Sequence, residues 1–295
     1  MRFIGKLLLV IVVALLIAGL LTYPAWTLIS HFADYRPDRV TRRIGTILLA
    51  IGVIWILRRE RLIDRATFGY GVPRDRFIRQ LIVGFVAGLL LMVPLVVGLI
   101  AFGVREWSHD VAIAQFVKSL VAGTVLGFAV SFLEETLFRG AMFSAIRRES
   151  GTWYAMILPS LLFAAGHFLF DPNTMRFSSG DMNYSSGLWI AAHAFADFAT
   201  PLEHVDAFAA LFALAILLSL VRLKTESIAA SVGLHAGGVA VIFVIGDLST
   251  MNPQATPSWV IPSYNHVVGW LLFAWISVIA IGYWVLSRKR IADSG

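Results

Sequence analysis

Long apolar segments alternate with short polar connections along most of the 295-residue chain. Apolar segments of about 20 residues have the length that an α-helix needs to cross the hydrocarbon core of a bilayer. The pattern therefore predicts an all-α fold, a polytopic transmembrane helical bundle of about eight helices. The predicted helices cover residues 4–30, 44–57, 80–103, 112–147, 152–170, 207–222, 227–246 and 266–287.

Three of these segments depart from a simple span. The second, 44–57, has only about 14 apolar residues, so it is tilted, half-inserted or flanked by arginines that reach the membrane surface. The fourth, 112–147, is longer than a span requires. The first follows Arg2 and Lys6 like a signal peptide, but no small-residue cleavage site comes after it, which favours a retained helix.

The composition excludes a soluble protein. Hydrophobic residues make up 58% of the chain and charged residues 14%, whereas soluble domains have roughly 45–50% and about 25%. The absence of cysteine excludes disulfides, cysteine metal sites and a thiol nucleophile. The net charge of +6 lies in short basic clusters between apolar segments. Such clusters are typical of membrane loops and do not indicate nucleic-acid binding.

The basic clusters also predict the topology. With both termini in the cytoplasm, most lysines and arginines lie on the cytoplasmic side, as the positive-inside rule requires. The cytoplasmic residues are Arg58, Arg59, Arg61, Arg65, Arg74, Arg76, Arg79, Arg147, Arg148, Arg222, Lys224, Arg288, Lys289 and Arg290. One cluster, at Arg36, Arg39, Arg42 and Arg43, breaks the rule. We expect a multi-pass protein of the bacterial inner (cytoplasmic) membrane.

The connection at 171–206 is unusual because it contains prolines, glycines and several acids. Within it, Trp189 to Phe198 is apolar enough for a short re-entrant or interfacial helix. His193 and Asp197 lie four residues apart there, a spacing that also suits a catalytic motif. A solvated or interfacial segment explains this pair more simply.

Charged residues inside a spanning helix are costly and mark functional sites by default. The segment from Ser131 to Gly140 carries Glu134, Glu135 and Arg139 in an apolar helix. Glu135 and Arg139 are four residues apart and are predicted to pair on one helix face. Glu134 lies about 100° around the helix and has no local cation. Such a carboxylate in a low dielectric binds protons readily, which suits a general base. The alternative is one buried salt-bridge network that holds helices together.

Two histidines, His167 and His235, also lie in apolar segments. At about 1.5 Å per residue, Glu134 lies roughly 20 Å, His167 roughly 24 Å and His235 roughly 14 Å from the cytoplasmic helix ends. All three residues are therefore predicted to meet within the membrane. Small residues near them allow the helices to approach closely. These residues are Gly140, Ala141, Ala164, Ala165, Gly166, Gly233, Gly237 and Gly238.

The order and spacing of these motifs resemble a known family. Glu134-Glu135-x-x-x-Arg139, Phe163-x-x-x-His167 and the late His235 in a Gly-Leu-His-Ala context are similar to the successive motifs of the CAAX-protease and bacteriocin-processing (CPBP or Abi) family, which is related to the CAAX prenyl endopeptidase. The resemblance covers roughly residues 75–250. We accordingly expect N-terminal helices and a basic loop in 1–74, a catalytic core in 75–250, and a C-terminal helix with a basic tail in 251–295.

The resemblance implies a role for each motif residue. Glu134 activates the hydrolytic water, His167 holds or polarises it, and His235 supports the transition state. Glu135 and Arg139 form a structural ion pair. The family fold is a helical bundle whose cavity opens towards the membrane or the cytoplasm, and we expect residues 163 and 239 to line it. Glu134, His167 and His235 also form a legitimate zinc-ligand set, so the cofactor is either none or a divalent metal such as zinc. A metal-independent glutamate mechanism is the preferred reading.

One position departs from the family pattern. Four residues after His235 the family usually has asparagine or another polar residue, and this chain has Val239. Loss of one oxyanion donor lowers a rate by about 10²–10³-fold. The predicted function is an intramembrane endopeptidase that acts on membrane-associated proteins or peptides, with membrane lipid as its surroundings. The alternative is a non-catalytic membrane scaffold or bacteriocin-immunity-type protein. A transporter is disfavoured because the sequence shows no internal repeat.

Overall fold

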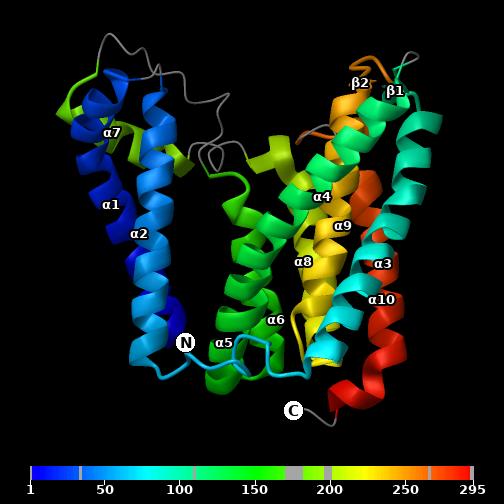
Figure 1. Cartoon of the computed structure of the whole chain (residues 1–295), viewed down its shortest axis with the longest axis horizontal. Coiled ribbons are helices and arrows are strands. Elements are labelled where there is room, and N and C mark those ends of the chain that lie inside the picture. The colour runs from blue at the N-terminus through cyan, green and yellow to red at the C-terminus, as the bar shows by residue number, and fades with distance from the viewer. Residues whose placement is uncertain are drawn as a thin grey trace. The chain divides into compact units, whose positions relative to one another are not determined.

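The computed structural model describes residues 2–32, 35–108, 111–169, 182–195, 201–264 and 267–292, and these are helical apart from short turns and one pair of strands (Figure 1). Within this part of the chain, seven helices are long and apolar enough to cross a membrane. They are α1 (Arg2–Ser30), α2 (Pro37–Arg59), α3 (Arg74–Ala101), the continuous helix Ile113–Ser150, α8 (Val205–Thr225), α9 (Ala229–Leu248) and α10 (Trp270–Ala292). A shorter apolar helix, α6 (Thr152–Gly166), is the eighth. The predicted all-α polytopic bundle is therefore confirmed.

The second helix is longer than its apolar segment. It begins at Pro37, which fits the first turn of a helix because its missing N–H needs no partner there. Asp38 lies in the first turn, and Arg58 and Arg59 lie in the last turn, where they complement the helix dipole. The prediction from hydropathy covered only the apolar residues 44–57 and therefore left out these polar ends of the helix. With 23 residues, α2 has the length of a full crossing.

The fourth helix keeps its predicted excess length but changes its winding. It runs as α4 (Ile113–Glu135), the π-helical segment η1 (Thr136–Met142) and α5 (Phe143–Ser150). The helix ends at Gly151, whose φ of 85° suits a residue without a side chain. The π segment begins directly after the two adjacent glutamates. Such segments occur mostly at functional sites.

The chain forms two compact units. The first consists of Met1–Ile63 and Ala165–Leu202, and it contains α1, α2 and α7 (Tyr184–Ala192). A capping box between Asn183 and Ser186 starts α7. This helix lies earlier than the predicted 189–198 segment, and Asp197 lies outside the described residues. His193 stacks on Trp189 and its Nδ1 lies 2.8 Å from the Trp189 carbonyl oxygen, a local contact.

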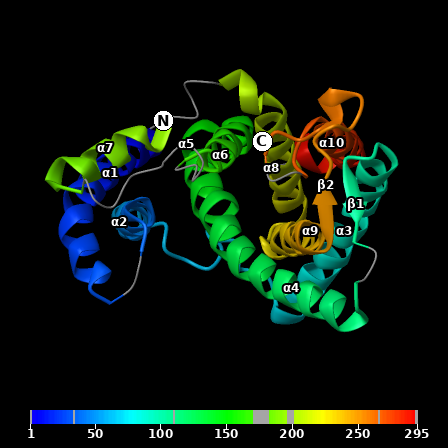
Figure 2. The same cartoon turned by 90° about the horizontal axis from the view of Figure 1, so that it is seen from above.

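The second unit consists of Asp64–Ala164 and Glu203–Gly295. In it α9 packs against both α3 and α4, while α8 packs against α10 (Figure 2). Glycine makes the approach of α9 possible. A Cβ atom on Gly237 would lie 2.5 Å from the Phe85 carbonyl oxygen, and one on Gly127 would lie 2.6 Å from the Ala236 carbonyl oxygen. The first contact brings α9 against α3, and the second brings the helix of His235 against the helix of the two glutamates.

The two units divide the chain differently from the predicted segments. The predicted catalytic core, 75–250, includes residues of both units, and the C-terminal helix α10 belongs to the second unit with α8 and α9. The two divisions rest on different criteria: the predicted boundaries follow the family motifs, whereas the two units are defined by their compactness. The functional boundaries 1–74, 75–250 and 251–295 therefore stay a prediction.

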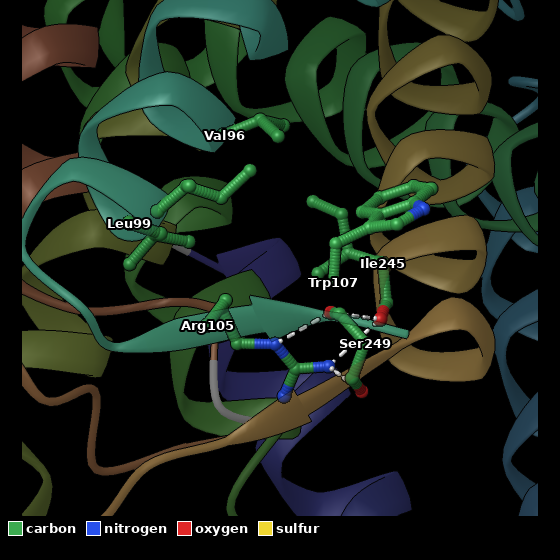
Figure 3. Close-up of a pocket in the computed structure, with 7 residues that line it drawn as sticks. Val96, Leu99, Arg105, Trp107, Ile245 and Ser249 are labelled. Carbon is green, nitrogen blue, oxygen red and sulfur yellow. Dashed lines mark hydrogen bonds between the residues drawn. The ribbon is translucent and has the colours of Figure 1, made fainter. Parts of the chain in front are cut away.

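A short strand pair, not predicted from the sequence, joins two helix ends of the second unit. Strand β1 (Arg105–Trp107) pairs antiparallel with β2 (Ser249–Met251). Arg105 is buried beneath the pair, where its guanidinium donates to Ser249 Oγ and to the carbonyl oxygens of Ile245 and Ser249 at 2.7–2.9 Å (Figure 3). A cation at the C-terminal end of α9 complements its dipole. Burial lowers the pKa of Arg105 from its ordinary value.

Candidate active site

The predicted ion pair forms within the second unit. Arg139 Nη1 donates to Glu135 Oε1 at 3.0 Å, and both side chains are fully buried. Arg139 Nη2 donates to the carbonyl oxygen of Ala215 in α8 at 3.1 Å. Arg222, also on α8, donates from Nε to the carbonyl oxygen of Arg139 at 3.2 Å. The pair therefore ties the π-helical segment to α8, as expected of a buried charge pair whose groups have further hydrogen bonds.

His235 joins the same carboxylate from α9. Its Nδ1 lies 3.1 Å from Glu135 Oε1, the oxygen that already accepts from Arg139. The His235 side chain is only 7% exposed. An Nδ1–H bonded to a buried carboxylate holds the imidazole ring in one orientation and one tautomer. Glu135 thus orients His235 in addition to pairing with Arg139.

Glu134 faces the other ring nitrogen. Its Oε2 lies 3.8 Å from His235 Nε2, and its side chain is 30% exposed. The sequence indicated no local cation for Glu134 on its own helix, and the structure places a titratable partner opposite it on α9. The two adjacent glutamates therefore lie beside different nitrogens of one histidine, Glu135 beside Nδ1 and Glu134 beside Nε2.

Phe163 of α6 forms an apolar wall of this cluster. Its ring lies edge-on to the His235 ring, with centroids 5.7 Å apart and planes at 71°. The Arg139 guanidinium lies 4.6 Å from the centroid of the same ring, within reach of a cation–π contact. Phe163 is 1% exposed. The Phe163 ring therefore limits the positions that the His235 imidazole and the Arg139 guanidinium can adopt.

His167 occupies a different place from the one predicted. Helix α6 ends at Gly166, so His167 lies in the turn that follows and not inside a helix extending to residue 170. Pro159 within α6 and the glycine at its end are consistent with an early stop. His167 belongs to the first unit, whereas Glu134 and His235 belong to the second. Its part in a common site stays a prediction from the sequence.

The division of the chain into two units also affects the hypothesis of a zinc site. Among the described residues, no group of three or more histidine, aspartate or glutamate side chains is arranged to hold a metal ion. The zinc set proposed from the sequence, Glu134, His167 and His235, combines residues of both units. Metal dependence therefore stays open.

Two concave surfaces of the second unit lie away from the acid–histidine cluster. One surrounds Arg105 beneath the strand pair (Figure 3). The other is an apolar groove of about 330 Å³ between α3 and α10, with Pro94 and Trp275 in its wall. Neither is lined by the residues of the cluster. The expected cavity lined by residues 163 and 239 therefore does not coincide with either surface.

The loop before α3 covers the π-helical segment, which the sequence did not indicate. Tyr70 OH lies 2.6 Å from Thr136 Oγ1, and the Phe68 carbonyl oxygen would lie 2.9 Å from a Cβ atom on Gly140. Asp64 begins this loop and accepts hydrogen bonds from the side chain and backbone of Thr67. These bonds lower the pKa of Asp64 below its ordinary value. The loop holds the helix segment that carries Arg139.

The fold and this cluster define an integral, multi-pass membrane protein in which a buried glutamate, arginine and histidine lie together beside a second, partly exposed glutamate. Residues 115–241 match the family model described as Rce1-like, "Type II CAAX prenyl endopeptidase Rce1-like". The matched segment contains all three motifs, so the resemblance of this segment to the CAAX-protease family is confirmed. Searches of curated proteins and of solved structures give no match to this chain.

Val239 lies one turn after His235 on α9 and is half-buried. If the chain hydrolyses peptides, we expect Val239→Asn to raise the rate by up to about 10²–10³-fold, because an amide there adds a donor for the developing oxyanion. A buried amide without a partner instead lowers the free energy of unfolding by about 1–3 kcal/mol. Rate and melting temperature measured on one preparation separate these effects. Val239→Leu serves as the apolar control, and a variant unchanged in both measurements would mean that residue 239 faces lipid.

Proposed function

We propose that this chain is an intramembrane endopeptidase that hydrolyses peptide bonds of membrane-associated proteins or peptides with a glutamate-activated water. The family match over residues 115–241 supports peptide hydrolysis as the class of reaction. The substrate is proposed as a polypeptide segment that reaches the membrane, because the acidic residues lie within a spanning helix.

One observation carries this proposal, the placement of His235 between two glutamates of different exposure. With Nδ1–H donated to Glu135, the Nε2 atom of His235 faces Glu134 across 3.8 Å. That separation is too long for a direct hydrogen bond, but it allows one water to contact both atoms. Glu134 is the acid that such a water contacts, because Glu135 already bonds directly to Nδ1.

The proposed steps balance in protons and bonds. Glu134 accepts a proton from the water while the water oxygen bonds to the carbonyl carbon of the peptide. His235, held by Glu135, accepts a hydrogen bond from the water at its unprotonated Nε2 and so directs the water oxygen at the carbonyl carbon. The carbon–nitrogen bond then breaks, and Glu134 returns the proton to the leaving amine. General-base assistance of this kind contributes about 10²–10⁴-fold to a rate.

Isotope labelling tests the reaction directly. The purified protein in lipid vesicles is incubated in ¹⁸O-enriched water with a set of membrane-associated peptides. The masses of the products are then measured by mass spectrometry. We expect two fragments from a cleaved peptide, with one ¹⁸O atom in the new carboxylate. Fragments that Glu134→Gln protein produces at the same rate would remove Glu134 from the mechanism and reject the proposal.

A non-catalytic scaffold is the second candidate, and Val239 at the usual position of a polar residue favours it. This candidate predicts that a Glu134→Ala chain keeps its full biological activity in cells. The endopeptidase hypothesis predicts that the same substitution removes that activity although the protein is still inserted in the membrane.

We further propose that both termini lie in the cytoplasm and that the protein resides in the bacterial inner membrane. The ends of α5 and β2 lie at opposite ends of the second unit, so the two sites report on opposite sides (Figure 1). The chain has no cysteine, so single cysteines at Ser150 and Gln254 can be labelled without background. We expect an impermeant thiol reagent on intact cells to label position 254 and to leave position 150 unlabelled. The reverse pattern would invert the topology.

A further inference from the structure

Ser131 is a buried hydroxyl that the mechanism above does not use. Its side chain is fully buried, and its Oγ has no hydrogen-bond partner within the described part of the chain. Several buried serines elsewhere in the helices donate to the carbonyl oxygen one turn earlier. Examples are Ser160 to Met156 at 2.6 Å and Ser219 to Ala215 at 2.9 Å. An unpartnered buried hydroxyl is destabilising and calls for an explanation.

The position of Ser131 places it next to the glutamate–histidine contact. The buried residues of α4 recur every four positions and face α9. They are Ser119, Gly123, Gly127, Ser131 and Glu135. On either side of Ser131, Gly127 lies against the backbone of Ala236, and Glu135 reaches the His235 ring. Ser131 therefore lies at the contact between α4 and α9, one turn before Glu135.

Two carboxylate oxygens close to Ser131 also lack a hydrogen-bond donor. They are Glu134 Oε2 and Glu135 Oε2, both buried without a hydrogen bond among the described residues. Ser131 lies three residues before the first and four before the second, so it neighbours both on the helix surface. Helical side chains tilt towards the N-terminus, which directs both carboxylates back towards Ser131.

Exposure decides between these acceptors. The Glu134 side chain is 30% exposed although its Oε2 is buried, so part of this carboxylate reaches solvent, whereas the Glu135 side chain is fully buried. A buried carboxylate oxygen needs a donor from the protein or from an enclosed water. The hydroxyl one turn away is suited to supply it.

We propose that Ser131 is a positioning residue of this site, whose hydroxyl donates to Glu135 Oε2 through one enclosed water. The inference rests on the proposed function. With Arg139 and His235 on Oε1, the third donor holds the plane of the carboxylate. Oε1 then stays directed at His235 Nδ1, and Nε2 stays directed at Glu134. Ser131 acts through Glu135 and does not contact the substrate.

The test compares Ser131→Ala with Ser160→Ala, a matched control in which another fully buried serine of the same unit loses its hydroxyl. We expect Ser131→Ala to lower kcat about tenfold, the loss of one hydrogen bond to a charged group, with KM little changed. Ser131→Thr, which keeps the hydroxyl, is expected to restore kcat. The imidazole ¹⁵N signals of His235, assigned by their loss in His235→Gln, are expected to shift in Ser131→Ala and to stay in Ser160→Ala.

Thermal unfolding makes the test independent of catalysis. A hydroxyl that donates to Glu135 stabilises the fold, so Ser131→Ala should lower Tm, whereas removal of an idle buried hydroxyl should leave Tm unchanged or raise it. Unchanged kcat, unchanged His235 signals and an unchanged or raised Tm would overturn the inference while the endopeptidase stands. A lowered Tm with shifted His235 signals in a protein that cleaves no peptide would support the positioning role and reject the proposed function.

Discussion

Glu134→Gln is expected to lower the rate of peptide hydrolysis by about 10²–10⁴-fold, the usual contribution of a general base. The amide keeps the size of the side chain but cannot accept the proton of the water. It leaves the buried contacts of Glu135 with Arg139 and His235 in place. Because the Glu134 side chain is 30% exposed, we expect the yield of folded protein and Tm to stay close to those of the unsubstituted chain.

The measurement is the rate of product formation at saturating substrate, with Tm determined on the same preparation. Glu106→Gln is a suitable control, because Glu106 is an exposed glutamate of the same unit in β1. This control should keep its full rate. A Glu134→Gln protein that cleaves peptide at the normal rate would remove Glu134 from the mechanism.

Arg139→Ala is expected to have the largest effect on stability, lowering the free energy of unfolding by about 3–5 kcal/mol. The substitution leaves the buried carboxylate of Glu135 without its cation, removes the bond to Ala215 and empties space beside Phe163. Yield after membrane extraction and Tm in detergent measure the effect.

Two variants test the cause of this loss. Arg76→Ala removes a partly exposed arginine of the same unit that lies 3.8 Å from Glu226 and donates to the Thr225 carbonyl oxygen, and a surface pair of this kind contributes only about 0–1 kcal/mol. Glu135→Gln combined with Arg139→Met removes both buried charges and should recover part of the stability, because neither partner is left charged and alone. Normal yield and Tm with abolished activity in Arg139→Ala would place the pair in the mechanism instead.

The sequence alone was enough to locate the acidic residues and their local pairing. Glu135 and Arg139 lie four apart on one continuous helix, and neighbours along a helix follow from its period. It could not reveal that His235 binds Glu135, since the two residues are 100 positions apart and meet only because α9 packs on α4. Ser131 was missed for the same reason. A serine in an apolar helix becomes conspicuous only when its burial and its missing partner are known.

The sequence by itself determined the class of fold, because every backbone polar group in a bilayer must be satisfied within a helix and each span must have a minimum apolar length. It did not determine where α2 begins or that α6 stops at Gly166, since polar first turns and early stops do not change the apolar pattern. Only the tertiary structure decided which nitrogen of His235 faces which glutamate. That choice depends on the register of α4 against α9. The close contact at Gly127 fixes α9 against α4, and the close contact at Gly237 fixes α9 against α3. Helix register is a property of packing between segments, and no periodicity within one segment encodes it.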